Sequence, residues 1–337
     1  MRLSKELNTA VEKSKEDSRP ADIDVTVIGS CDICYNITSQ LDAVKKLNVN
    51  VVKEKKLALN SGEARELMEK YSIEKFPAII IFGEIDKLNI AGFEKIEDAL
   101  VLTKIPPPYL DRSGKTVGLV SLIYLKDDSC KECTDLVESI ANLGMFMKIT
   151  KEILVDVKDA PEYITKYRIT KVPTIVLQGD FSAYGIDETL NESGTIETDG
   201  SFVLRDIAPP YKDLLTKKIV GLIDLVYLTD EKCIECYDVN LHKSILTRLG
   251  FKFAKEELID IESANGKSLV EKYKIEKAPT FIMTGDIKSY PSASVLNDVG
   301  TFEGNAFVFR NLDLIGDYKD LKTGELVKLE ESTTQPT

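Results

Sequence analysis

The stretch Tyr71-Ser-Ile73-Glu-Lys75-Phe-Pro77 decides how this chain is organised, because it returns twice with the same internal spacing. The second copy is Tyr167-Arg-Ile169-Thr-Lys171-Val-Pro173 and the third is Tyr273-Lys-Ile275-Glu-Lys277-Ala-Pro279, so the shared pattern is Y-x-I-x-K-x-P. An apolar run follows each proline and predicts a strand at that point. A motif that recurs in this way indicates three copies of one structural unit.

A Cys-x-x-Cys pair precedes each copy of the motif by 40 to 43 residues, counted from the second cysteine to the proline. All six cysteines of the chain belong to these pairs, which are Cys31 and Cys34, Cys130 and Cys133, and Cys233 and Cys236. The first cysteines of successive pairs lie 99 and 103 residues apart, which is a common size for a single domain with its own core. The repeat therefore predicts three domains, each with its own thiol pair.

Composition narrows the classes of function. The chain has 337 residues and a net charge of −12, which disfavours binding to nucleic acid or to anionic membranes, because phosphate groups would be repelled. No apolar run is long enough to span a membrane, and the first residues lack the apolar core of a signal peptide. The location stays open between the cytoplasm and an extracytoplasmic compartment reached with a leader or anchor since removed.

The apolar patterning predicts alternating strands and helices in each unit. For the first unit the predicted order is a strand at 23–28, a helix opened by Cys31 to Cys34, a strand at 49–52, a helix capped by Ser61 and running to Tyr71, strands at 77–82 and 88–91, and a last helix at 94–103. The second and third units repeat this order, with Gly144 and Gly250 ending the helices that follow their cysteines. We expect a longer excursion after the proline strand in these two units, and no final helix.

These patterns predict the following division of the chain: an N-terminal helix or tail at 1–21, a first domain at 22–105, a Pro-rich linker at 106–116, a second domain at 117–208, a linker at 209–216, a third domain at 217–329 and a flexible tail at 330–337.

The order of elements and the two motifs resemble the thioredoxin-like superfamily. Its Tyr-x-Ile-x-x-x-Pro-Thr form stands at 167–174 and 273–280, while Ala78 replaces the threonine in the first unit. The resemblance covers nearly the whole chain. It implies an α/β fold of three tandem thioredoxin-like domains, each a central mixed sheet flanked by helices. It also implies that the prolines of the motif are cis and form a substrate groove beside the thiols, together with the residues before them: Pro77, Pro173, Pro279, Phe76, Val172 and Ala278.

Tandem domains of this kind, each with a Cys-x-x-Cys pair, resemble protein disulfide oxidoreductases and isomerases. This chain departs from thioredoxin itself, because it contains no tryptophan and the residues between the cysteines differ. The acid that thioredoxins place six residues before the first cysteine is replaced by Val25, Tyr124 and Tyr227. We therefore expect proton transfer during exchange to use another group or to be slow.

Thiol–disulfide exchange needs a thiolate nucleophile and a second thiol that resolves the mixed disulfide. Two cysteines at a helix N-terminus supply both, because the helix end lowers the pKa of the first thiol. We expect Cys31, Cys130 and Cys233 to be the nucleophiles and Cys34, Cys133 and Cys236 to resolve. No cofactor is expected beyond these dithiol pairs. The expected partners are protein thiols or disulfides and a separate redox partner.

Carboxylates around the pairs act against the thiolate. They lie inside the Cys-x-x-Cys loops or just before them: Asp32, Glu132, Glu235, Asp127, Asp128, Asp230 and Glu231. Lys131 and Lys232 offset them only in part. The sequence thus favours a mild reductant or isomerase over a strong donor of disulfides.

Other interpretations stay open. The pairs fit three static disulfides or soft-metal sites, although zinc takes four ligands and each unit offers two cysteines. The single histidine, His242, is expected on the surface of a helix. The tyrosines of the repeated motif are expected in the core, and its lysines in solvent. A chain of three thioredoxin-like domains would also suit a scaffold or chaperone that wraps a client polypeptide.

Overall fold

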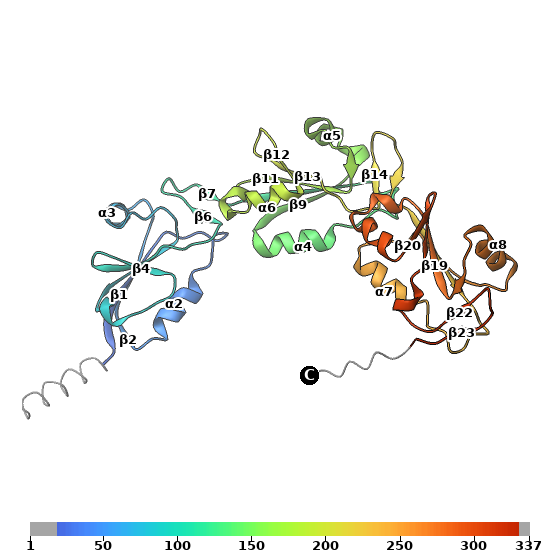
Figure 1. The fold of residues 1–337 in the computed structure, drawn as a ribbon. Helices are drawn as coiled ribbons and strands as arrows, with labels where there is room; N and C mark the ends of the chain where they lie inside the picture. The colour runs from blue at the N-terminus through green and yellow to red at the C-terminus, as the bar shows by residue number, and fades with distance from the viewer. Residues whose placement is uncertain (1–18, 330–337) are drawn as a thin grey trace, which may run out of the picture.

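The described part of the chain, residues 19–329, forms one unit repeated three times in a computed structural model (Figure 1). The blue, green and orange lobes of Figure 1 follow one another along the sequence. Each lobe has its own five-stranded mixed sheet with helices beside it, which confirms the α/β class and the three tandem thioredoxin-like domains. Almost all of the predicted N-terminal helix or tail at 1–21, and the whole predicted tail at 330–337, lie outside the described residues.

The first sheet has the strand order β2-β1-β3-β5-β4. Its strands are β1 (Ala21–Ile28), β2 (Val49–Leu57), β3 (Ala78–Gly83), β4 (Phe93–Ile96) and β5 (Ala99–Leu102). Strands β1 and β2 are parallel, and the other pairs are antiparallel. Its helical elements are α2 (Thr38–Lys45), α3 (Gly62–Lys70) and the short 3₁₀ helix η1 (Ile85–Lys87). Ser61 caps α3 as predicted, since its hydroxyl accepts the Ala64 N–H.

The second and third sheets repeat this topology, with the orders β9-β8-β11-β13-β12 and β17-β16-β19-β21-β20. The second unit contains β8 (Val120–Lys126), α4 (Val137–Phe146), β9 (Ile149–Asp156), α5 (Pro161–Tyr167), β11 (Thr174–Gly179), α6 (Asp187–Ser193), β12 (Gly194–Ile196) and β13 (Phe202–Leu204). The third contains β16 (Ile223–Thr229), α7 (Leu241–Arg248), β17 (Lys255–Asp260), α8 (Ala264–Lys272), β19 (Thr280–Gly285), the 3₁₀ helix η5 (Pro291–Asp298), β20 (Gly300–Glu303) and β21 (Ala306–Phe309).

Each sheet is covered on both faces, so its central strands carry apolar residues on both sides. In the first unit, Val44 of α2 packs with Ile79 and Ile81 on one face. On the other face, Met68 of α3 packs with Ile80. This explains the unbroken apolar run after each motif proline. Tyr71, Tyr167 and Tyr273 are buried in the cores, as predicted.

Two predicted elements of the first unit are wrong. The predicted strand at 88–91 has no regular structure, and the predicted helix at 94–103 is the hairpin of β4 and β5. Glu97, in the turn between them, has a φ of 52°, which is the left-handed region and cannot continue a helix. A short apolar run such as Ala99–Leu102 fits a buried helix or a buried strand equally well by periodicity, and here all four residues are buried in the sheet. In the second unit, the predicted end of the helix after the cysteines at Gly144 also needs correction, because α4 continues to Phe146.

The ranges 106–116 and 209–216, predicted as linkers, take part in backbone pairing beside the motif prolines. Phe76 and Leu110 exchange two backbone hydrogen bonds of 2.9 and 2.8 Å, and β6 (Tyr109–Leu110) then pairs with β7 (Thr116–Val117). In the second unit, β14 (Tyr211–Asp213) pairs with β10 (Lys171–Val172) and with β15 (Ile219–Val220). The third unit has the same arrangement in β18 (Lys277–Ala278), β22 (Tyr318–Asp320) and β23 (Leu326–Val327). The segment after each sheet thus pairs with the residue before the motif proline.

Candidate active site

The six cysteines form three disulfides within their own pairs. The Cys31–Cys34, Cys130–Cys133 and Cys233–Cys236 bonds join Cα atoms that are 5.3, 5.4 and 5.4 Å apart. All six side chains are half-buried, so every pair is reachable at the edge of its domain. No group of three or more His, Cys, Asp or Glu side chains that could hold a metal ion occurs among residues 19–329.

The strand that leads to each pair is bonded to the strand that begins after each motif proline: Ile28 pairs with Ala78, Leu125 with Thr174 and Leu228 with Thr280. The peptide bonds that precede Pro77, Pro173 and Pro279 are cis. Cys130, Cys133 and Pro173 line one hollow of about 270 Å³. In the third unit, Sγ of Cys236 lies 3.9 Å from the carbonyl oxygen of Ala278. The structure therefore brings together residues that are about forty positions apart in the sequence.

The segment after each sheet holds the cysteine loop from the other side. The residue after the second cysteine donates its backbone N–H to a carbonyl oxygen of that segment: Tyr35 to Pro108 at 2.7 Å, Thr134 to Pro210 at 2.7 Å, and Tyr237 to Asp317 at 2.8 Å. Sequence reasoning missed this contact. The repeated Pro-Pro-Tyr at 107–109 and 209–211 was its signal, although the third unit has Gly316-Asp317-Tyr318 there.

The predicted helix start is wrong in all three units. Helices α2, α4 and α7 begin four, four and five residues after the second cysteine, not at the first. The cause is a short polar side chain two residues after each second cysteine. Asn36, Asp135 and Asp238 each accept the backbone N–H two residues further on, at 2.9 Å, and this local turn replaces the helix. Since the helix dipole acts only over the first turn, the helix end does not supply the predicted lowering of the first thiol's pKa.

Lysines neutralise part of the acidic surroundings. Asp230 has a fully buried side chain and an ion pair of 2.8 Å with Lys319, and the hydrogen bond between them raises the pKa of Lys319. Asp127 occupies the same position in the second unit and lies 3.3 Å from Lys212. Hydrogen bonds from Ser129, and after them the Lys212 ammonium, hold the pKa of Asp127 below its usual range. Both acids stand three residues before the first cysteine.

The first unit lacks this ion pair. Ile28 stands three residues before Cys31, and Leu110 takes the place of Lys212 and Lys319. Both residues belong to one apolar cluster. Around the other pairs, Lys126 pairs with Asp128 at 2.9 Å and Lys328 with Glu235 at 2.5 Å. The three sites therefore share a backbone frame and differ in their buried charges.

His242 is a buried residue, which corrects its predicted place on the surface. Its side chain lies on the inner face of α7 with 3% of the residue exposed. The ring centroids of Phe281 and Phe309 are 4.7 and 4.6 Å away, and Nε2 lies 3.1 Å from the Tyr237 hydroxyl. Burial among these groups lowers the pKa of His242 from 6.5 to about 4. The side chain is thus a neutral core residue near pH 7.

The lysines of the repeated motif were predicted to lie in solvent, and this prediction needs correction. Each ammonium lies over the ring of a tyrosine in the segment after the sheet: Lys75 over Tyr109 at 4.8 Å, Lys171 over Tyr211 at 4.7 Å and Lys277 over Tyr318 at 4.5 Å. Cation–π contacts of this kind are worth about 0.5–1 kcal/mol at exposed sites. They add to the attachment of that segment beside the motif proline.

Each domain thus has the thioredoxin-like arrangement of a disulfide beside a cis-proline at the edge of a mixed sheet. No protein-family model matches the chain, and no curated protein matches it either. No helix among residues 19–329 is long and apolar enough to cross a membrane.

Three solved structures illustrate what the chain is similar to. ERdj5 in crystal form I is 12% identical over 80% of this chain and 37% of that chain, with a TM-score of 0.17. The chain therefore spans well under half of the length of ERdj5. Human ERp44 in a zinc-bound form is 10% identical over 78% of each chain, with a TM-score of 0.14. The NTD_N/C domain of alkylhydroperoxide reductase AhpF from Enterococcus faecalis is 16% identical over 49% of this chain and 81% of that domain, with a TM-score of 0.15. Likeness at this level carries no argument about function.

Proposed function

We propose that this chain catalyses thiol–disulfide exchange on proteins at its three Cys-x-x-Cys pairs. The observation that supports this most is the repeated placement of a half-buried pair beside a cis-proline, in the same frame three times. Three static disulfides would stabilise the fold equally well away from the edge of each domain. A repeated, reachable pair at that edge suits a reaction that exchanges sulfur bonds with another molecule.

The reaction uses the two cysteines in turn. The thiolate of the first cysteine attacks one sulfur of a client disulfide and forms a mixed disulfide, and the client's other sulfur leaves as a thiolate and takes up a proton. The second cysteine then attacks the mixed disulfide and releases the reduced client, so the pair is oxidised as the client gains two electrons. Cys31, Cys130 and Cys233 are the proposed nucleophiles. In the third unit, Cys233 lines an open hollow of about 370 Å³ while Cys236 lies against Ala278, which supports this order.

The surroundings support a mild reductant or isomerase. The helix N-terminus lies too far along the chain to favour the thiolate, and carboxylates such as Asp32 and Glu132 sit within the loops. The ion pairs of Asp127 and Asp230 remove only part of this negative charge. The substrate groove is proposed at Pro77, Pro173, Pro279 and the residues before them. A separate protein would supply or accept the electrons, with no bound cofactor.

Removing the nucleophiles tests the proposal. In the assay, dithiothreitol reduces insulin and the chain accelerates this reaction. Changing Cys31, Cys130 and Cys233 together to serine is expected to lower the rate to the uncatalysed one, because serine cannot form the mixed disulfide. Each single substitution is expected to leave about two thirds of the activity if the distant sites act independently. Serine at Cys34, Cys133 or Cys236 instead is expected to trap a mixed disulfide that mass spectrometry detects.

The matched control is serine at all six cysteines, examined for folding by circular dichroism. A triple nucleophile variant that still accelerates insulin reduction would contradict the proposal. The chaperone function would be favoured by two results together: the native chain shows no exchange activity, and the six-serine variant still suppresses aggregation of an unfolded client. Metal binding is examined on the freshly reduced protein by native mass spectrometry, where added metal mass would oppose the exchange function.

A further inference from the structure

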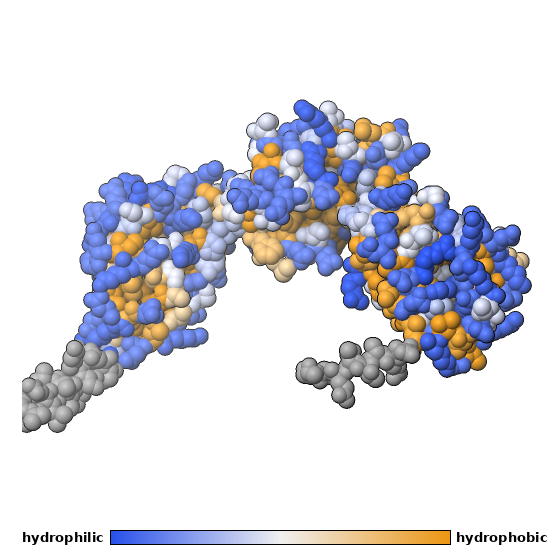
Figure 2. All heavy atoms as spheres, in the orientation of Figure 1, coloured by the Kyte–Doolittle hydropathy of each residue, from blue (hydrophilic) through white to orange (hydrophobic). Residues whose placement is uncertain are grey.

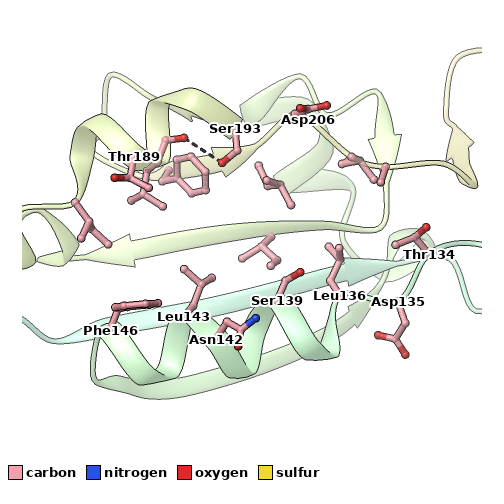
Figure 3. A pocket seen from close by; sticks show the side chains of 17 residues that line it. Thr134, Asp135, Leu136, Ser139, Asn142, Leu143, Phe146, Thr189, Ser193 and Asp206 are labelled. Atoms are coloured by element: carbon pink, nitrogen blue, oxygen red, sulfur yellow. Dashed lines mark hydrogen bonds between the residues drawn. The ribbon is translucent and has the colours of Figure 1, made fainter. Parts of the chain in front are cut away.

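The middle domain contains an apolar pocket. Its volume is about 630 Å³, and it lies between α4 and α6 over one face of the sheet (Figure 3). Most of the side chains that line it are apolar, among them Leu136, Leu143, Phe146, Ile175 and Leu204. Its polar lining includes Ser139, Asn142 and Thr189. This size falls within the range of about 300–1,000 Å³ that is usual for ligand pockets.

Aromatic rings occupy the corresponding space in the third domain. His242 stands six residues after Cys236, where the second domain has Ser139 six residues after Cys133. Phe281 takes the place of Ile175, two residues after the motif proline, and Phe309 takes the place of Leu204. The rings of Phe281 and Phe309 stack with centroids 5.1 Å apart, and His242 packs on both. Three larger side chains thus fill what is a pocket in the second domain.

The first domain carries a hydrogen-bonded pair at the equivalent positions. Gln40 stands six residues after Cys34, and its Nε2 donates to the Tyr35 hydroxyl at 2.5 Å. The third domain has the equivalent pair, Tyr237 and His242. In the second domain both positions carry small residues, Thr134 and Ser139. The pocket therefore goes with small residues at these two positions and with α6, which has no counterpart in the first domain and is replaced by the 3₁₀ helix η5 in the third.

The pocket adjoins the hollow that holds the disulfide of its own domain. Thr134 and Asp135 line it and also line the smaller hollow that contains Cys130, Cys133 and Pro173. Figure 3 shows Thr134 and Asp135 at one end of the pocket and Phe146 at the other. A ligand that fills it would therefore lie along α4, with one end beside the hollow of the disulfide.

The rim of the pocket carries apolar side chains that face solvent. On α4, Phe146 is 69% exposed, and its neighbour Met145 is 73% exposed. Figure 2 shows apolar residues gathered on the middle lobe where α4 lies below α6. Large exposed apolar groups beside a pocket are typical of surfaces that bind another molecule.

We propose that this pocket binds an apolar peptide segment of the client, next to the cysteine that exchanges with Cys130. The inference rests on the proposed function for the identity of the occupant. A peptide is favoured over a separate small molecule because the pocket adjoins the hollow of the Cys130–Cys133 disulfide and its other end is open at the exposed Phe146 of α4. The apolar lining selects leucine- or phenylalanine-rich segments over polar ones. The second domain would then be the one that chooses clients, and the first and third would exchange disulfides with less selection.

A binding measurement tests the pocket without any exchange. The probe is a fluorescently labelled, cysteine-free peptide rich in Leu and Phe, with a Ser- and Asn-rich peptide of equal length as its partner. Fluorescence anisotropy is recorded with the full chain and with the six-serine variant, and we expect both to bind the apolar peptide alike. The filled variant copies the third domain with Thr134→Tyr, Ser139→His and Leu204→Phe. It is expected to bind at least tenfold more weakly.

Two further variants keep the test decisive. Ser139→Gln is a single substitution that introduces the residue found at this position in the first domain. It should also weaken binding, and it replaces the triple variant if that variant does not fold. Leu154→Phe enlarges an exposed apolar residue of β9 outside the pocket and should leave binding unchanged. Equal affinity of the filled and native chains, or equal affinity for the apolar and polar peptides, would overturn the proposal. Binding of anilinonaphthalene sulfonate without binding of the apolar peptide would overturn it too. Loss of exchange activity alone would refute only the proposed function, because the six-serine variant carries the binding result.

Discussion

Replacing Lys319 with leucine is expected to destabilise the third domain by about 3 kcal/mol, the low end of the range for breaking a buried ion pair. The substitution leaves the fully buried carboxylate of Asp230 without its ammonium, 2.8 Å away in the native domain. The backbone N–H of Lys232, which donates to Asp230 at 3.0 Å, is a remaining partner but carries no charge. Hydrogen exchange measured by mass spectrometry on β19 reports this loss for the third domain alone.

The first domain supplies the compensating change. It has Ile28 and Leu110 at the two positions, packed in one apolar cluster. The double variant Asp230→Ile and Lys319→Leu is therefore expected to recover most of the stability, because well-packed apolar residues replace a buried ion pair at little cost. Lys322→Leu is the matched control: its ion pair with Glu276 is exposed, and its loss should cost less than about 1 kcal/mol. A double variant no more stable than Lys319→Leu alone would contradict this explanation.

Acidification is expected to destabilise the third domain through His242. Its pKa is about 4 in the folded domain and 6.5 when unfolded, so the unfolded chain binds the proton more tightly. The contribution of neutral His242 to the free energy of unfolding is fully present above pH 6.5 and is lost as the pH falls towards 4. A difference of this size corresponds to about 3 kcal/mol at most. The chain has one histidine, so no other imidazole contributes in this window.

A single NMR signal measures this pKa directly. The Cε1–H resonance of His242 is expected to stay at its neutral position down to about pH 4 in the native chain, and to titrate near pH 6.5 in urea. His242→Phe keeps an aromatic ring in the same space, and Tyr237 still donates to the carbonyl oxygen of Pro279 at 2.9 Å. This variant should lose the part of the pH dependence that His242 contributes, which is measured most cleanly between pH 6.5 and about 5, above the range in which the carboxylates titrate. A native signal that titrates near pH 6.5 would show that the ring is exposed.

Much of the fold could be predicted because its signals are local and occur three times. The apolar runs after Pro77, Pro173 and Pro279 predict buried strands, and the structure confirms them as β3, β11 and β19. The hairpin of β4 and β5 was not predictable by the same reasoning. Its short apolar run suits either a helix or a strand, and pairing with β3 decides between them.

The sites were predictable in outline only. The motifs predicted that each cysteine pair lies near its proline, which the structure shows, but the helix starts depended on the turns made by Asn36, Asp135 and Asp238. The buried place of His242 and the pocket beside Ser139 arise from packing between α7 or α4 and distant strands. Such contacts leave no periodic signal in the sequence. Aligning the three repeats on their second cysteines does reveal the difference, since Gln40, Ser139 and His242 then occupy one position.

The central claim is that the three pairs are exchange sites and not static bonds. The most direct test is the reduction potential of each pair in the full chain, measured with the other two pairs changed to serine, in glutathione and dithiothreitol buffers. We expect three reversible two-electron couples between about −270 and −180 mV, the range of thioredoxin-like reductants and isomerases. A potential below about −300 mV for all three pairs would identify structural disulfides and contradict the claim.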